Sequence, residues 1–142
     1  MNLEQRIESI KQRFSRHGQW EDRYREIIEL GKEQPEMAEA DKIDRYKVKG
    51  CQSQVWLKPE FVQDKVNFQA DSDALLVKGI VSILVMIYSG ATADEIIKHE
   101  PTFLKELGIA EHLSMNRSNG LSSMLKQIKM YAMAAKALAN RG

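Results

Sequence analysis

The chain has 142 residues, the length of one compact domain, and a chain of this size can bury a hydrophobic core without a disulfide or a structural metal. Its 21 basic and 20 acidic side chains nearly cancel, and no block of lysine or arginine gives the electrostatic footprint of a nucleic-acid-binding protein. The longest apolar run, residues 79–88, is about half as long as a membrane-spanning helix requires, and residues 1–20 carry too many charges for a signal peptide. The sequence therefore predicts a single domain over residues 1–142 in the cytoplasm, with neither nucleic acid nor a membrane as a partner.

The first third of the chain has the apolar spacing of two amphipathic helices. In the first helix the apolar positions are Leu3, Ile7, Ile10 and Phe14. After a break at Gly18, a second helix is predicted to begin near Trp20 and to stop at Gly31. Pro35 and the polar residues 36–45 then predict a loop.

The middle of the chain changes to the short alternating segments of a small sheet. Three strands are predicted, at residues 46–49, 53–58 and 65–70. The inward positions are expected to be Val48, Val55, Leu57, Val66 and Phe68. Only Gly50, Cys51 and Gln52 connect the first two strands, so a tight reversal is expected to hold the thiol at the tip of an antiparallel sheet.

The second half of the chain is predicted to be helical. Residues 74–88 are apolar nearly all round and are expected to form a buried central helix, ended by Gly90. The candidate N-caps of this helix are Asp71, Ser72 and Asp73. A capping box at residues 92–95 opens a short helix, Pro101 allows another before Gly108, and residues 119–139 have the pattern of a long final helix. Helices, then strands, then helices predict an α+β fold in which a small three-stranded antiparallel sheet packs against helices.

Cys51 is the only cysteine of the chain. An isolated free cysteine is most often a small buried hydrophobe. Cys51, however, lies between Gly50 and the polar residues Gln52 and Ser53, where backbone N–H groups can face a thiolate and the backbone of another protein can come close. The three histidines are scattered, and neither a metal-ligand spacing nor a phosphate-binding glycine loop is present, so no metal or cofactor is expected.

Residues 48–57, Val-Lys-Gly-Cys-Gln-Ser-Gln-Val-Trp-Leu, resemble the signature of the SufE and CsdE family, whose members accept sulfur from pyridoxal-phosphate cysteine desulfurases. Residues 71–74, leading into residues 77–79, and residues 117–121 agree with the family in order and spacing. The resemblance implies that Cys51 carries the sulfur as a persulfide, and that the fold is the α+β sandwich shared with the iron–sulfur scaffold IscU. It also implies that the chain activates a SufS- or CsdA-like desulfurase and passes sulfur to a SufBCD-like scaffold. The additional cysteine ligands of IscU are missing, so cluster assembly on this chain is not expected.

The same resemblance names Gly50, Gln52, Ser53, Asp73 and Arg117 as supporting residues, although Asp73 could be only a helix cap and Arg117 only a surface arginine. We expect the turn at residues 50–52 to hold the sulfur against apolar side chains at rest and to swing outward when the desulfurase docks. Two other functions stay open. One is a thiol redox enzyme or sensor, which would lack a second cysteine to resolve a sulfenic acid, and the other is an adaptor in which the thiol is incidental.

Overall fold

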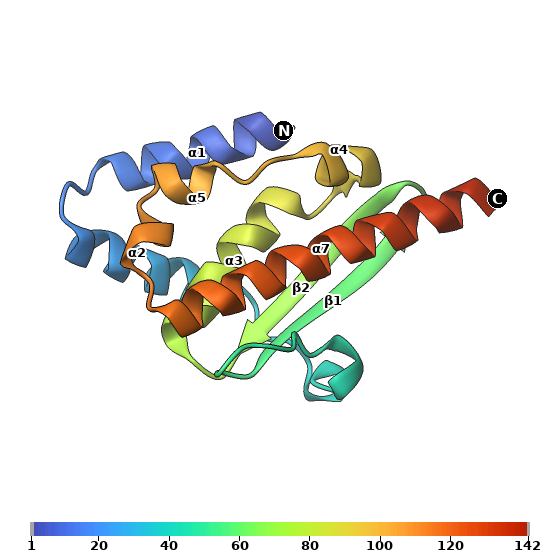
Figure 1. The fold of residues 1–142 in the computed structure, drawn as a ribbon, viewed down its shortest axis with the longest axis horizontal. Coiled ribbons are helices and arrows are strands. Elements are labelled where there is room, and N and C mark those ends of the chain that lie inside the picture. Colours follow the sequence, from blue (N-terminus) through green and yellow to red (C-terminus); the bar gives the residue numbers. More distant parts are fainter. Residues whose placement is uncertain (1, 142) are drawn as a thin grey trace.

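The computed structural model describes residues 2–141, so Met1 and Gly142 of the expected domain lie outside the described residues. Seven α-helices and a three-stranded antiparallel sheet make up the described part (Figure 1). The helices are α1 (Leu3–Ser15), α2 (Trp20–Glu33), α3 (Leu75–Tyr88), α4 (Ala93–Lys98), α5 (Phe103–Glu106), α6 (Ile109–His112) and α7 (Met115–Arg141). The strands are β1 (Val55–Val62), β2 (Lys65–Ser72) and β3 (Ala91–Thr92), and two 3₁₀ turns, η1 (Glu39–Asp41) and η2 (Asp44–Tyr46), precede β1. The α+β prediction is therefore confirmed.

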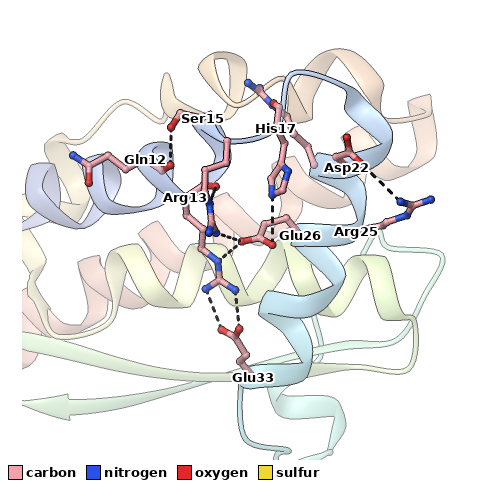
Figure 2. Close-up of polar contacts among 10 residues, drawn as sticks. Gln12, Arg13, Ser15, His17, Asp22, Arg25, Glu26 and Glu33 are labelled. Carbon is pink, nitrogen blue, oxygen red and sulfur yellow. Dashed lines mark hydrogen bonds and ion pairs between the residues drawn. The ribbon is translucent and has the colours of Figure 1, made fainter.

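An ion-pair network joins α1 to α2. Arg13 on α1 forms a two-pronged pair with Glu33, with nitrogen–oxygen distances of 2.7 and 3.0 Å, and it also contacts Glu26 on α2 (Figure 2). His17, in the connection between the helices, points toward the same Glu26 carboxylate. Beneath this polar layer the predicted apolar positions of α1, Leu3, Ile7, Ile10 and Phe14, are all buried.

Gly31 does not end α2, which continues to Glu33. Gly31 instead lies where α2 crosses α3, and a Cβ atom at this position would be 2.8 Å from the backbone nitrogen of Gly79. A Cβ atom at Gly79 would be only 2.2 Å from the carbonyl oxygen of Ile27. The sequence pattern predicts a helix stop here, but the glycine is needed because two helix backbones touch.

The sheet has the order β1-β2-β3. β1 and β2 form a hairpin that is paired from Val55↔Ser72 to Val62↔Lys65, whereas β3 pairs with only two residues of β2. The predicted inward positions on these strands are buried, namely Val55, Leu57, Val66 and Phe68. Figure 1 shows α7 running along the length of this hairpin, and α3 also packs against β2.

The strand predicted at residues 46–49 is wrong. Its beginning is the 3₁₀ turn η2, and its only sheet-like contact is an isolated bridge between Lys47 and Trp56. Val48 is nevertheless buried, and its N–H donates to the carbonyl oxygen of Val55 at 2.8 Å. The third strand is β3, which follows the left-handed Gly90 and has two residues, too few to show an alternating pattern.

The remaining helix boundaries agree in part with the prediction. The capping box of α4 is present, with the Glu95 N–H donating to the Thr92 hydroxyl at 3.2 Å. α6 was not predicted, and α7 begins at Met115, four residues before the predicted start. Among residues 2–141, no helix has the combination of length and hydropathy needed to cross a membrane.

Candidate functional site

Cys51 lies in the irregular loop between η2 and β1, and its side chain is half-buried against α7. The thiol donates a hydrogen bond to the carbonyl oxygen of Gly120 across 3.6 Å. The prediction of a thiol held by a tight reversal between two strands is therefore wrong in its framework, because only β1 follows the loop as a strand. The loop instead follows the 3₁₀ turn η2 along the chain and packs against the first half of α7.

Two close approaches fit the loop onto α7. Gly50 has a φ of +88°, a left-handed conformation that favours glycine, and a Cβ atom there would be 2.8 Å from the Ser123 hydroxyl. A Cβ atom at Gly120 would be 3.1 Å from the sulfur of Cys51. Small residues on α7, one turn apart, therefore make room for the Gly50–Cys51 backbone and for the thiol.

A pocket of about 80 Å³ opens beside the thiol. Its apolar wall comes from two helices, with Val77 and Ile80 on α3 and Leu121 and Met124 on α7. Polar residues complete the lining, namely Gln52, Ser53, Asn116, Arg117 and the backbone of Gly120. The sulfur of Cys51 thus stands between an apolar interior and a polar rim.

Burial raises the pKa of the Cys51 thiol above its ordinary value. A buried thiol loses the hydration that stabilises its thiolate, and burial is the cause of this shift. Because the thiolate is the nucleophile in sulfur exchange, the resting conformation keeps Cys51 protonated and weakly reactive at neutral pH.

The structure brings most of the predicted site residues together. Gln52, Ser53 and Arg117 line the pocket with Cys51, and Gly50 shapes the loop beside it. Arg117 is exposed and lies in the first turns of α7, so this arginine stands at the rim of the site.

Asp73 lies outside the pocket lining, and the alternative that it caps a helix is wrong, because the N-cap of α3 is Ala74. Its carboxylate accepts the N–H of Gln54 at 3.0 Å, and its own N–H donates to the Gln54 carbonyl at 3.2 Å. The Ser72 hydroxyl donates to the same carbonyl at 2.8 Å and also accepts the Ala74 N–H, next to the start of α3. Ser72 and Asp73 therefore fix the end of the Cys51 loop at Gln54.

Sequence reasoning missed the α3 and α7 side chains that form the pocket. On α7 the lining residues Arg117, Gly120, Leu121 and Met124 follow the spacing i, i+3, i+4 and i+7 of one helix face. Because the helix was predicted to begin at residue 119, Arg117 was placed outside it and this face was not recognised.

Asp71 is buried beside the loop anchor. It accepts the Met37 N–H at 3.0 Å and lies 3.4 Å from the Lys78 ammonium and 3.6 Å from that of Lys42. Burial acts to raise the pKa of Asp71, but the N–H donors of Met37 and Ser72 and the two lysines outweigh burial and hold the pKa below its usual range. Asp71 thus connects the segment before the Cys51 loop to β2 and α3.

Metal ligation finds no support in residues 2–141, where no group of three or more histidine, cysteine, aspartate or glutamate side chains is placed to hold an ion. The Cys51 pocket contains one thiol and no carboxylate or imidazole among its lining residues.

The chain is similar to several known proteins. The family model of SufE, a Fe-S metabolism associated domain, matches residues 8–132. An uncharacterized SufE-like protein of Rhizobium meliloti (strain 1021) is 42% identical over 131 residues, which cover 89% of this chain and 94% of that protein. Another, from Rhizobium etli, is 47% identical over 115 residues, or 78% of each chain.

A solved structure supports the fold. The solution structure of a hypothetical protein from Thermus thermophilus superimposes with a TM-score of 0.75 at 18% identity, covering 93% of this chain and 96% of that one. The family model and the relatives at 42% and 47% identity, taken with the fold, assign the chain: it belongs to the SufE family of Fe-S metabolism associated domains.

Proposed function

We propose that this chain is one SufE-like domain over residues 1–142 that accepts sulfur on Cys51 from a pyridoxal-phosphate cysteine desulfurase. It carries the sulfur as a persulfide to an iron–sulfur cluster assembly scaffold of the SufBCD kind. The observation that carries this proposal is the half-buried thiol on a glycine-containing loop beside an apolar pocket. Membership of a family associated with Fe-S metabolism supports the same assignment.

The transfer is an exchange between two sulfur atoms. Cys51 loses its proton, and its thiolate attacks the outer sulfur of the persulfide on the desulfurase cysteine. A bond forms between that sulfur and Cys51 Sγ, the sulfur–sulfur bond of the donor breaks, and the donor cysteine leaves as a thiolate. No external oxidant or reductant is needed. Freeing the donor cysteine prepares the desulfurase for its next turnover, so removal of sulfur accelerates that enzyme.

The pocket supports the carrier role because it has room for one added atom beside the thiol. Its volume of about 80 Å³ exceeds the ~10–15 Å³ that a single water requires. The apolar side chains Val77, Ile80 and Met124 would shield an outer sulfur from water and small thiols. This is the expected resting position of the persulfide.

Delivery requires the loop to move, and its contacts suggest where it would bend. Val48 is fixed by its hydrogen bond to Val55, and Gln54 is fixed by Ser72 and Asp73. Between these fixed points, Gly50 and Gln52 are exposed. Movement between residues 49 and 53 would break the Cys51–Gly120 hydrogen bond and expose the thiol without disturbing β1.

The test follows radioactive sulfur from labelled cysteine through a desulfurase onto this chain. The wild-type chain should acquire label that dithiothreitol removes, and it should raise the desulfurase turnover. Cys51→Ser should still bind the enzyme but acquire no label and give no stimulation. The double variant Cys51→Ser with Ser53→Cys is a matched control, because it returns a thiol to the same loop two residues away and should transfer sulfur poorly.

Other outcomes identify the rival functions. Stimulation retained in Cys51→Ser would favour an adaptor and reject the carrier role. If mass spectrometry detects peroxide oxidation of Cys51 but no added sulfur after incubation with desulfurase and cysteine, the thiol belongs to a redox sensor.

A further inference from the structure

The charges of the chain are unevenly distributed along the sequence. Residues 45–59 and 112–142 contain none of the 20 acidic residues of the chain. They contain nine of its 21 basic residues, namely Arg45, Lys47, Lys49, Lys58, Arg117, Lys126, Lys129, Lys136 and Arg141. The near-neutral total therefore combines two strongly basic segments with an acidic remainder.

The fold places the two basic segments beside each other. Gly50 lies against Ser123 of α7, and Cys51 against Gly120. Farther along α7, the Tyr131 hydroxyl donates to the carbonyl oxygen of Leu57 on β1 at 3.2 Å, and Trp56, the neighbour of Leu57, forms a bridge with Lys47. The segment from Arg45 to Cys51 thus runs alongside α7 with Cys51 near the start of the helix.

Six of these basic side chains form no ion pair with a described residue: Lys129, which is half-buried on α7, and five others. Lys58 and Lys136 pair with Asp41 and Asp94, whereas no ion pair in residues 2–140 involves Arg45, Lys47, Lys49, Arg117 or Lys126. Four of the five are exposed, and Lys47 is half-buried. We call these five residues the basic rim.

The acids nearest to the rim in the sequence do not neutralise it. Asp44 directly precedes Arg45 and forms no ion pair among the described side chains. Asp73 approaches the Cys51 loop, but its carboxylate accepts the Gln54 N–H. Asp44 and Asp73 are thus two carboxylates against five cations, and the basic rim keeps an excess of positive charge.

We propose that the basic rim is a docking surface for an acidic surface on the protein that donates sulfur to Cys51. This inference rests on the proposed function and adds to it the charge of the partner. Oppositely charged surfaces speed encounter and orient the two proteins, which a transfer between single sulfur atoms requires.

Apolar side chains at the same site favour a protein partner over a nucleic acid. Leu75 is 60% exposed and Met115 is 78% exposed. They stand at the first residues of α3 and α7, and Val77 and Asn116 of these helices line the Cys51 pocket. The phosphate backbone of a nucleic acid would leave these two apolar side chains exposed to water. A protein partner can bury them at the centre of an interface that polar residues surround.

The experiment measures binding of the full chain to the pyridoxal-phosphate cysteine desulfurase encoded in the same genome, alongside label transfer. Lys49→Glu with Lys126→Glu reverses one charge on each basic segment. Lys65→Glu with Lys98→Glu changes the net charge equally at two exposed lysines on β2 and α4 that belong to neither segment. We expect the rim variant to bind at least about tenfold more weakly in low salt, and the control to bind like the wild type. About 300 mM salt should weaken wild-type binding and reduce this difference.

The two readouts separate the two proposals. If the wild type transfers sulfur but neither charge reversal nor salt alters its binding to the desulfurase, the docking proposal is overturned and the carrier function stands. If binding depends on the rim but no label reaches Cys51, the carrier function fails and the docking surface stands. Tight binding of a duplex DNA that the rim variant loses, with desulfurase binding unchanged, would make the rim a nucleic-acid site and also overturn the proposal.

Discussion

The surroundings of Cys51 place two opposing requirements on one sulfur atom. Contact with Gly120 and the apolar pocket shields the sulfur, and the same burial raises the pKa of the thiol. A persulfide carrier benefits from shielding after transfer but needs a thiolate during it. Under the proposed function, the resting structure would be the protected state, and acceptance of sulfur would require a change in the loop.

This environment predicts the pH dependence of Cys51 alkylation by iodoacetamide, a neutral reagent. Because burial raises the thiol pKa, less thiolate is present in the folded chain than in the unfolded chain at any pH below that pKa. The midpoint of the rate against pH should lie higher for the folded chain than for the same chain in guanidinium. Restricted access lowers the rate at every pH but does not move the midpoint. An equal or lower midpoint in the folded chain would contradict the raised pKa.

At the scale of elements, the crossing of α2 and α3 fixes the helix that forms one wall of the pocket. The backbones of these helices touch at Gly31 and Gly79, and Val77 and Ile80 flank Gly79 on α3. Because β2 packs on the same helix, the position of α3 is set from two sides. The wall of the pocket formed by α3 is therefore held by packing against both α2 and β2.

Gly79→Ala should destabilise the fold. Its added Cβ atom would meet a backbone oxygen at 2.2 Å, so the helices must separate, and we expect a loss of about 1–3 kcal/mol in the free energy of unfolding. The higher helix propensity of alanine, ~1 kcal/mol, opposes only part of this loss. Gly18→Ala is the control, because no atom lies within 4 Å of a Cβ there and the change should stay within about 0.5 kcal/mol. Urea unfolding with equal midpoints for the two variants would show that the crossing is not tightly packed.

The elements also show what sequence reasoning could and could not predict. Long periodic patterns were sufficient for α1 and α3, because apolar spacing reports burial directly. The strands predicted at residues 53–58 and 65–70 lie on β1 and β2 but stop four and two residues short of the observed ends, where the outer end of β1 is exposed and does not show the pattern. Residues 46–49 have the alternation of a strand, but Tyr46 is the last residue of η2 and the segment makes only one bridge to β1. The role of Gly31 could not be decided from the sequence, since glycine is favoured both where a helix ends and where two helices cross closely. Cys51 was identified by its motif, whereas its pocket needed the meeting of α3 with α7.

At the scale of the whole molecule, the Cys51 loop lies between two firmly fixed parts. On one side, Ser72 and Asp73 hold Gln54 at the start of β1. On the other side, the segment before the loop is tied to the core through Asp71, which contacts Met37, Lys42 and Lys78. The loop movement proposed for sulfur transfer would leave both of these supports in place.

Asp71→Asn should lower stability in a pH-dependent way. The pKa of Asp71 is depressed in the folded chain, so its ionisation contributes stability that is present above its unfolded pKa and is lost as pH falls through the folded pKa. Near neutral pH the variant should lose about 1–3 kcal/mol of unfolding free energy, because Lys42 and Lys78 lose a buried carboxylate. Below about pH 4 the difference from the wild type should shrink, since the native side chain also becomes neutral.

Asp73→Asn is the control, because its amide oxygen can still accept the Gln54 N–H and the side chain is exposed. Its free energy of unfolding should stay within about 0.5 kcal/mol of the wild type throughout. Guanidinium unfolding between about pH 7 and about pH 3 measures both variants. A deficit for Asp71→Asn that stays constant over this range would mean that shape and hydrogen bonding at Asp71, and not its charge, join the segment before the loop to the core.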